Sequence, residues 1–478
     1  MKESYQNAFK SLFVLSLLIR ITYAFYLSDA LFAGDAKGYY DHALYLLGKA
    51  EHIDFKWISF WSPGESLYLS VWIYVFGTSK WVIVSSMLAV WTAFFFIWNA
   101  WASFFLQAKT RFFILLIFSI FPTFIHHSVV PLTHLPATTC MLAVFYGFCV
   151  PVKAKQALKI GAIFGFLLLI RPSNMLLGLL FPFFIQQKKQ ILLVCLTSLL
   201  VVGSWSVYLY KKTDTFIFIS ESNAYNLYMG NHPETPKYAT WWWATHTWEN
   251  GSVLKREADS LLTFPAGQIG KNFQSLALHY IAEKPFDFVL RSLNRVRCFF
   301  AFDTFTGAML AERHHKYVAY AAIGIDAVCY MLFMGLFLLS FLARRCSQMK
   351  ADNADNISYQ LAVSSEQFCK PCISQLSTFH SQLSTFHSQL STFNSPFFIF
   401  HFSFSILLLS LPYFFSFSHP TYHFAIFPLI AIGAGVLLEN KEKLNKNIPV
   451  GRKAIVLSLL LAFVAIQIEW IYFWIQQK

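Results

Sequence analysis

Residues 191–210 read ILLVCLTSLLVVGSWSVYLY, an uncharged and largely apolar run that directly follows Lys188 and Lys189. A helix of about 20 residues is about 30 Å long, which matches the hydrocarbon core of a bilayer. Similar apolar runs recur along the chain from Ser11 to Trp474. These runs predict a protein that crosses the membrane many times.

The composition leads to the same prediction. The 478-residue chain is 56% hydrophobic and 19% aromatic, and only 13% of its residues are charged. An ordinary soluble domain has about 25% charged residues. A soluble protein of this size cannot bury so much apolar surface, so the composition excludes that class.

The predicted fold is an all-α polytopic membrane protein with about eleven transmembrane helices and with further helices in its extracytoplasmic loops. The segment from Glu65 to Phe76 is too short to cross and ends at Gly77, so we expect an interfacial helix there. The predicted spans are about 11–27, 81–106, 112–130, 135–150, 157–170, 174–185, 191–210, 318–341, 397–417, 419–438 and 455–474.

The formal net charge of +13 comes from short Lys and Arg clusters between apolar runs, not from one basic stripe. This distribution argues against a nucleic-acid partner. A cytoplasmic N-terminus places every cluster on the cytoplasmic side, as the positive-inside rule requires. The clusters are Lys109 and Arg111; Lys153, Lys155 and Lys159; Lys188 and Lys189; Arg344 and Arg345; and the lysines and arginine of 441–453. Segments 28–61, 126–136 and 211–317 then lie outside, where we expect any chemistry.

The same topology divides the chain into modules. They are an N-terminal transmembrane module (1–210) with the first extracytoplasmic loop (28–61), an extracytoplasmic loop subdomain (211–317), a transmembrane helix (318–343), a cytoplasmic low-complexity linker (344–396) and C-terminal transmembrane helices (397–478). Within the linker, residues 374–393 repeat SQLSTFH nearly three times. The heptad spacing of Leu and Phe suggests a coiled coil, but the Ser and Thr content favours a flexible linker.

Cysteine and histidine patterns do not indicate a metal site. The eight cysteines are spread along the chain and imply no disulfide framework. The Cys369 to Cys372 pair, with His380 and His387, matches no common zinc module. The three histidines of segment 126–134 could bind a metal or carry protons, but no neighbouring carboxylate completes a ligand set. No metal and no cofactor is predicted, and the chain has no Walker A loop, G-x-G-x-x-G turn or D-x-D pair that would indicate nucleotide chemistry.

The strongest candidate for catalysis lies in the first outer loop. Residues 34–43 read GDAKGYYDHA and place Asp35, Tyr39 and Ala43 on one face of a short helix. The Asp35 carboxylate can take a proton from an attacking hydroxyl as a general base, or it can merely cap this helix. The residues alone do not decide between these two roles.

Three further charged residues have a functional and a structural interpretation. Glu65 follows Ser62-Pro63-Gly64, where it favours the dipole of the interfacial helix, and Gly64 would let the backbone approach a substrate closely. Arg171, before Pro172, can hold a lipid phosphate or extend to the membrane interface. Arg20, near the middle of the first span, should face protein, water or phosphate because a guanidinium is costly among lipid tails.

Several landmarks, taken in order, resemble the GT-C group of polytopic glycosyltransferases, near the branch that contains protein O-mannosyltransferases and the lipid A aminoarabinose transferase. These landmarks are Arg20 in the first span; the acidic loop with Asp35, Tyr39 and Ala43; the Pro63-Gly64 start of a helix that runs to Phe76-Gly77; Gly165 to Met175 with Arg171-Pro172-Ser173; Tyr225 to Pro233 with a Gly-Asn-x-Pro element; Lys284-Pro285 with Arg291; and Tyr422 to Pro428.

The resemblance implies a role for each candidate residue. Asp35 would be the catalytic base or would orient the acceptor, and Arg171 and Arg20 would meet the phosphate of a polyprenyl-phosphate sugar. The other predicted substrate-binding residues are Tyr39, Asp41, Glu65, His134, Asn231 and His423. Two positions depart from the pattern, because His134 stands where many relatives carry an acidic residue and Ala36 replaces the second acid of an Asp-Glu pair.

The sequence therefore predicts a glycosyltransferase that moves a sugar from a polyprenyl-phosphate donor to a glycan, lipid or protein acceptor at the outer face of the membrane. The expected location is the bacterial inner membrane, with the active site facing the periplasm or exterior. The alternative is a transporter or flippase of a lipid-linked glycan, although the chain shows no inverted repeat.

Overall fold

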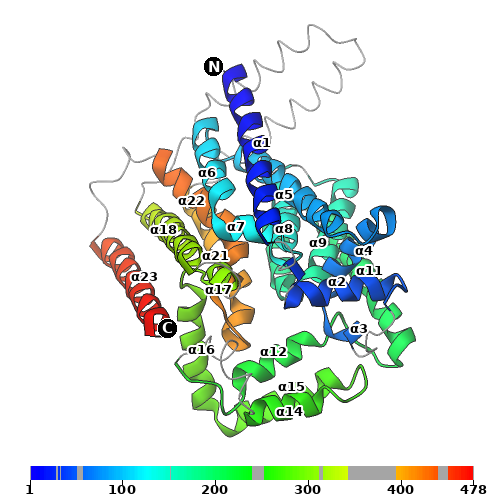
Figure 1. The fold of residues 1–478 in the computed structure, drawn as a ribbon. Coiled ribbons are helices and arrows are strands. Elements are labelled where there is room, and N and C mark those ends of the chain that lie inside the picture. The colour runs from blue at the N-terminus through cyan, green and yellow to red at the C-terminus, as the bar shows by residue number, and fades with distance from the viewer. Residues whose placement is uncertain are drawn as a thin grey trace.

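The computed structural model describes residues 2–27, 31–32, 34–50, 57–150, 152–238, 252–311, 316–342, 395–439 and 450–476. Within these ranges every regular element is a helix, and no strand occurs (Figure 1). The predicted all-α class is thus confirmed. The SQLSTFH repeat and the Cys369 to Cys372 pair lie outside the described residues.

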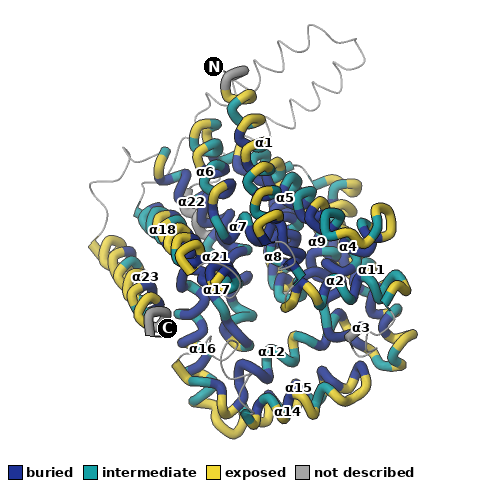
Figure 2. The backbone as a smooth tube through the Cα atoms, viewed as in Figure 1, coloured by how far each residue is buried: buried dark blue, intermediate teal, exposed yellow. Residues whose placement is uncertain are grey.

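Six helical segments of the described chain are long and apolar enough to cross a bilayer. They lie in α1 (Lys2–Leu27), α5 (Lys80–Ala102), α11 (Lys188–Thr213), α18 (Lys316–Ser340), the pair η3 (Pro420–Ile426) and α22 (Phe427–Glu439), and α23 (Val450–Gln476). α23 and the outward side of α1 expose most of their surface although they are apolar (Figure 2). An exposed apolar helix face is stable only in lipid, so the protein is an integral membrane protein.

Other predicted spans form shorter helices. They are α6 (Ala108–Ile120), α8 (His134–Phe148), α9 (Ala154–Ile170) and α21 (Ser395–Phe415), whose apolar part Phe402–Phe415 is short. Pro122 begins a separate short helix, α7 (Pro122–His127), because proline lacks the N–H that would continue α6. The structure therefore supports six spans by length, and the eleven predicted crossings remain a prediction.

The predicted span 174–185 differs most from an α-helix. It consists of the 3₁₀-helix η2 (Pro172–Leu180) followed by the single turn α10 (Phe181–Phe184). Proline stands at the start of both elements, where its ring fits the first turn and its missing N–H costs nothing. A 3₁₀-helix rises about 2.0 Å per residue, so this segment reaches further than an α-helix of equal length.

Small residues bring α9 and α11 close together. A Cβ atom on Gly161 would lie 2.6 Å from the carbonyl oxygen of Val194, and one on Gly165 would lie 2.8 Å from Val201. Ser198 Oγ also donates to the carbonyl oxygen of Gly161 at 2.9 Å. Glycine and serine at the contact let the backbones approach, which is a common way of packing helices in membranes.

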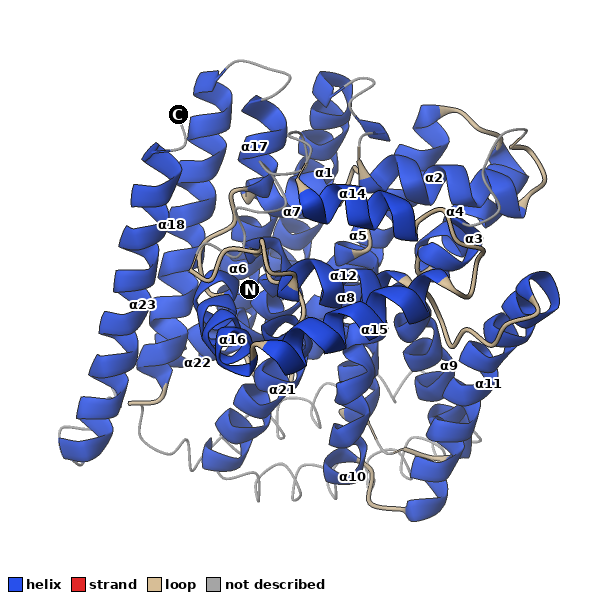
Figure 3. Cartoon of the chain, turned by 90° about the horizontal axis from the view of Figure 1, so that it is seen from below, coloured by secondary structure: helices blue, strands red, loops and turns tan. Residues whose placement is uncertain are grey.

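A layer of shorter helices lies along the lower edge of Figure 1, away from the N-terminus. It contains α12 (Ser222–Asn231), α14 (Val253–Leu261) and α15 (Ile269–Glu283), and in the view from below it lies in front of the bundle (Figure 3). Its own apolar core includes Tyr228, Leu254 and Phe273. α15 is followed by α16 (Pro285–Phe299) and α17 (Phe305–Ala311).

The segment predicted as the first outer loop, 28–61, contains α2 (Asp35–Leu46) and α3 (Trp57–Phe60), and α4 (Pro63–Phe76) follows it. The helix predicted at 65–76 is therefore confirmed, and it ends where Gly77 takes a φ of 90° that side chains disfavour. Glu221 joins this loop to the layer, because its carboxylate accepts from Ser59 Oγ at 2.5 Å and from the backbone N–H of Gly270 at 2.7 Å.

Candidate functional site

A cavity of about 680 Å³ lies where α2, η2, α12 and the end of α21 meet. Pockets of roughly this size bind small molecules through apolar walls and a few convergent polar groups. Four of the predicted site residues line it: Asp35, Tyr39, His134 and Arg171. Other polar lining residues are Ser62, Thr133, Ser173, Ser220, Ser222, Asn223, Asn226 and Ser416.

Asp35 is the first residue of α2 and faces this cavity. The preceding residue, Gly34, forms the helix cap without any side-chain hydrogen bond, so Asp35 does not serve as the cap. The carboxylate remains accessible to solvent through the cavity. Crowding by protein raises the pKa of Asp35 above its usual value, and the charge of Arg171 partly offsets this rise.

The packing of α2 explains the position of Asp35. On the buried face of α2, Tyr39 and Ala43 pack against Leu69 and Ile73 of α4, and Ala36 packs in the cluster of Val84 and Leu132. A Cβ atom on Gly38 would lie 2.8 Å from the Trp61 ring. The glycine thus allows α2 to approach Trp61, and this approach brings Asp35 to the edge of the cavity.

Arg171 lies where α9 ends and η2 begins. Pro172 forces the preceding residue out of the helical region, and Arg171 accordingly adopts a φ of −142° and a ψ of 96°. Its guanidinium carbon lies 5.3 Å from the ring centre of Tyr422 and 6.0 Å from that of Tyr413. Within the described chain no carboxylate forms an ion pair with Arg171, so aromatic faces hold the cation and its N–H groups are free to bind an anion.

His134 begins α8 on the same wall of the cavity. Neither of its ring nitrogens has a hydrogen-bond partner among the described residues, and the same holds for the neighbouring His127. The two imidazole centres are 4.4 Å apart. Buried nitrogens usually have a hydrogen-bond partner, so water or a polar group of a ligand in the cavity can bind His134, which lines it, whereas His127 lies behind the lining.

Aromatic side chains form much of the remaining wall. The lining rings are Tyr39, Phe60, Trp61, Phe218, Tyr225, Tyr413, Phe415, Phe417 and Tyr422. The rings of Tyr413 and Tyr422 stack at 4.6 Å, and Ser173 Oγ hydrogen-bonds to the Tyr413 hydroxyl at 2.9 Å. These contacts connect η2 with α21 and η3 and hold the two rings beside Arg171. Tyr413 was not among the predicted site residues, because nothing in its sequence context distinguishes it from other aromatic residues of an apolar run.

Glu65 is completely buried in the first turn of α4 and does not line the cavity. Neither carboxylate oxygen has a hydrogen-bond partner in the described chain, and burial raises the pKa of Glu65 to about 8. The predicted close approach of Gly64 is to protein, not to substrate, because a Cβ atom there would lie 2.5 Å from the backbone nitrogen of Ile170. α4 therefore supports the end of α9, next to Arg171.

The structure does not bring Arg20 or Asp41 to the cavity. Arg20 is buried within the bundle, where it donates to the carbonyl oxygens of Ser16 and Ser119 at 3.0 Å and lies 3.4 Å from the Trp91 ring centre. Asp41 forms an ion pair with Lys37 on the surface of α2. Both charged side chains thus already have partners within the protein.

Asn231 and His423 also lie apart from the cavity lining. Asn231 donates to the carbonyl oxygens of Leu227 at 2.8 Å and of Phe415 at 3.2 Å. His423 contacts the carbonyl oxygen of Phe299 through Nδ1 at 3.0 Å and stacks on Tyr330 at 4.3 Å. The geometry assigns both side chains to packing between elements instead of ligand contact.

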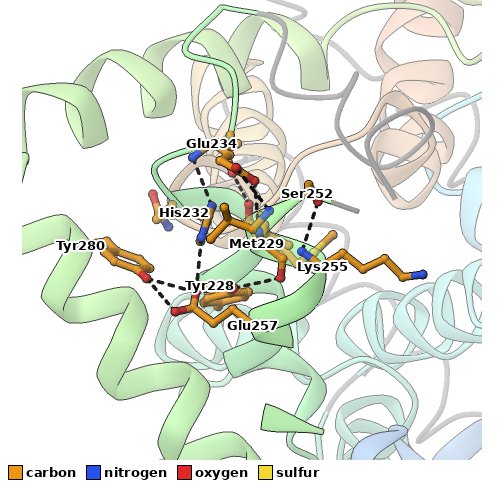
Figure 4. A network of polar contacts seen from close by, with 12 residues as sticks. Tyr228, Met229, His232, Glu234, Ser252, Lys255, Glu257 and Tyr280 are labelled. Carbon is orange, nitrogen blue, oxygen red and sulfur yellow. Dashed lines mark hydrogen bonds and ion pairs between the residues drawn. The ribbon is translucent and has the colours of Figure 1, made fainter. Parts of the chain in front are cut away.

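A polar network stabilises the helical layer beside the cavity (Figure 4). The Glu257 carboxylate accepts hydrogen bonds from the hydroxyls of Tyr228 at 2.7 Å and Tyr280 at 3.0 Å, and His232 Nε2 lies 3.3 Å from it. Glu234 accepts from the first N–H groups of α14. This network fixes the end of α12, whose first residues line the cavity.

No known protein family, curated protein or solved structure matches this chain. The fold and the site define a class: an all-α integral membrane protein with a polar and aromatic cavity beside a layer of short helices. Its function must be inferred from the chemistry of that cavity.

Proposed function

We propose that this chain is a GT-C-type glycosyltransferase, which moves a sugar from a polyprenyl-phosphate donor to a glycan, lipid or protein acceptor at the outer face of the membrane. The observation that carries the proposal is that Asp35 and Arg171, from separate elements, line one cavity. A carboxylate and a guanidinium without an ion-pair partner suit the two charged centres of this reaction.

The reaction needs a base at one end and a cation at the other. The acceptor hydroxyl attacks the anomeric carbon of the sugar, and Asp35 accepts its proton as the new C–O bond forms. The bond between that carbon and the phosphate oxygen breaks, and the phosphate leaves with the electron pair. Arg171 stabilises the negative charge that develops on the leaving phosphate.

A lipid-borne donor fits both the absence of a nucleotide motif in the sequence and the proposed membrane topology. The energy of the sugar–phosphate bond drives transfer, so the reaction requires no nucleotide at this site. We propose eleven crossings in a bacterial inner membrane, with the cavity open toward the periplasm or exterior. This topology gives the donor access from the bilayer and the acceptor access from water.

The experiment is sugar transfer by the purified protein in liposomes, with radiolabelled polyprenyl-phosphate sugars and a cell-envelope extract as the acceptor source. We expect transfer by the wild type and by Asp41→Asn, whose ion pair lies away from the cavity, and loss of transfer by folded Asp35→Asn. Retained transfer by Asp35→Asn would reject its role as the base. Movement of the lipid-linked sugar between leaflets without transfer would identify a transporter instead.

A further inference from the structure

Helix α16 has the opposite polarity from a surface helix of a water-soluble protein, because its apolar side chains are exposed and its polar side chains are buried. Its exposed large side chains are Phe286, Val289 and Leu293, whose exposed fractions are 76%, 51% and 64%. At 100° per residue these positions lie within about 60° of one another around the helix. The buried face instead carries Arg291, Asn294 and Arg295, with Cys298 and Phe299 near its end.

Backbone carbonyl groups of the protein accept hydrogen bonds from the buried polar face. Arg291 Nε donates to the carbonyl oxygen of Thr235 at 3.1 Å, and Asn294 Nδ2 donates to that of Lys237 at 2.9 Å. Arg295 donates to the carbonyl oxygens of Gly230 and Phe414. Two guanidiniums inside and three large apolar residues outside favour an outer medium that is less polar than the inner contacts.

The neighbouring helix of the layer shows the ordinary polarity. α15 buries Ile269, Phe273 and Ala277. Its exposed face is mostly polar, with Lys271, Gln274, Ser275, His279 and Glu283, and Leu278 is the one large apolar side chain exposed on this helix. The change of polarity between α15 and α16 therefore marks a change of solvent. α15 faces water, whereas α16 faces an apolar medium.

Contacts on either side place α16 among apolar helices. Phe288 stacks on Phe415 of α21 at 6.2 Å, and Arg297 Nη1 forms an ion pair of 2.5 Å with Glu469 of the membrane-spanning helix α23. The apolar segment of α21 exposes Leu407 (48%) and Phe415 (46%). The exposed apolar face of α16 thus continues the lipid-facing surface of the neighbouring helices.

We propose that α16 is embedded in the outer leaflet, with Phe286, Val289 and Leu293 in contact with lipid acyl chains. This inference is independent of the proposed enzymatic activity. It has one consequence for the cavity: Phe415, Ser416 and Phe417 line it and directly follow Phe414, which Arg295 of α16 binds. The cavity wall at the end of α21 then lies next to the bilayer, where a lipid-borne ligand can arrive.

The test is photocrosslinking in liposomes with p-benzoylphenylalanine in place of Val289 or Leu293. We expect covalent lipid adducts in mass spectrometry, as at the positive control Leu200, which is 73% exposed on the membrane-spanning helix α11. The matched control is Ser275 on α15, where we expect severalfold less lipid adduct. All variants use the full chain, and thermal unfolding checks that each remains folded.

Two outcomes would overturn the inference. The first is an adduct between Leu293 and a second copy of the chain in place of lipid, which would make this face a protein interface. The second is a lipid yield at Leu293 no higher than at Ser275 while Leu200 crosslinks well. Loss or retention of sugar transfer does not bear on either outcome.

Discussion

The two charges of the cavity are coupled, and this coupling predicts a pH effect. Desolvation by the surrounding protein raises the pKa of Asp35, and the charge of Arg171 lowers it. As the proposed base, Asp35 must be unprotonated, so we expect activity to fall as the pH is lowered through this pKa. Arg171→Gln removes the cation, raises the pKa of Asp35 further and moves the acid limb of kcat/KM to higher pH. We also expect about 100-fold lower activity at the optimum, because the leaving phosphate loses its stabilising cation.

The control for this prediction is Lys188→Gln, which removes one positive charge from the start of α11, away from the cavity. We expect its pH profile to match that of the wild type. An unchanged acid limb in Arg171→Gln would show that Asp35 and Arg171 are not coupled during turnover.

A second prediction concerns the buried carboxyl of Glu65. Burial raises its pKa from 4.5 to about 8. Because the folded pKa exceeds the unfolded one, the contribution of this group to stability is complete below pH 4.5 and is lost as the pH rises through about 8. We expect wild-type protein in detergent to lose up to a few kcal/mol of stability between pH 6 and pH 9, with little loss in Glu65→Gln.

The measurement is thermal unfolding across this pH range, with Glu283→Gln on the exposed surface of α15 as the control. If the stability of Glu65→Gln declined with pH as much as that of Glu283→Gln, the pH dependence would belong to groups other than Glu65.

Sequence reasoning at the residue scale was most successful where the chemistry is local. Asp35, Tyr39, His134 and Arg171 were predicted site residues, and all four line one cavity. The contact between Arg171 and Tyr422 was not predictable, because it depends on how η2 and η3 both pack against α21. A buried arginine such as Arg20 can be satisfied by carbonyl oxygens, and their positions are visible only in the fold.

At the scale of elements, the contact between α4 and α9 sets the position of Arg171. A Cβ atom on Gly64 would lie 2.5 Å from the Ile170 backbone, which cannot move without displacing the next residue, Arg171. We therefore expect Gly64→Ala to cost about 1–3 kcal/mol of stability and to reduce sugar transfer. Thermal unfolding and transfer assays on the same preparation test both effects.

Gly203→Ala is the matched control for this contact. Gly203 lies in α11 with no atom within 4 Å of an added Cβ. Alanine favours a helix over glycine by up to about 1 kcal/mol, so this variant should be as stable as the wild type or slightly more stable. Equal effects of Gly64→Ala and Gly203→Ala would show that the close contact between Gly64 and Ile170 does not determine stability or transfer.

The sequence predicted elements well where a turn signal bounds an apolar run. The helix predicted at 65–76 ends at Phe76 in the structure, directly before Gly77, as expected. The run at 174–185 was predicted to be a membrane span, and that remains a prediction. Pro172 before the run and Pro182 within it stand at the starts of η2 and α10, which have a different rise per residue. Apolar composition alone does not distinguish these helix types, because it reports the surrounding solvent and not the backbone hydrogen bonds.

For the whole molecule, the number of crossings determines on which side each terminus lies. Eleven crossings from a cytoplasmic N-terminus place residue 478 outside. We expect alkaline phosphatase fused after residue 478 to be active and green fluorescent protein fused there to be dark, since the two reporters fold on opposite sides of the bacterial inner membrane. A fusion within the predicted cytoplasmic linker, 344–396, should give the reverse. The same result at both positions would require an even number of crossings between them and a revised topology.

Glu221 connects the first outer loop to the helical layer and so influences the whole cavity. Its buried carboxylate binds Ser59 Oγ and the N–H groups of Gly267 and Gly270, at the start of α15. Glu221→Ala leaves these donors unpaired, at a cost of about 1–3 kcal/mol for each one that stays buried. We expect faster hydrogen exchange in α3 and in 266–272, a lower melting temperature and weaker sugar transfer.

The control, Glu283→Ala, removes an exposed carboxylate from the same layer and should leave exchange unchanged. If exchange rose only around residue 221, loop and layer would be stable independently, and the cavity would depend on the bundle alone.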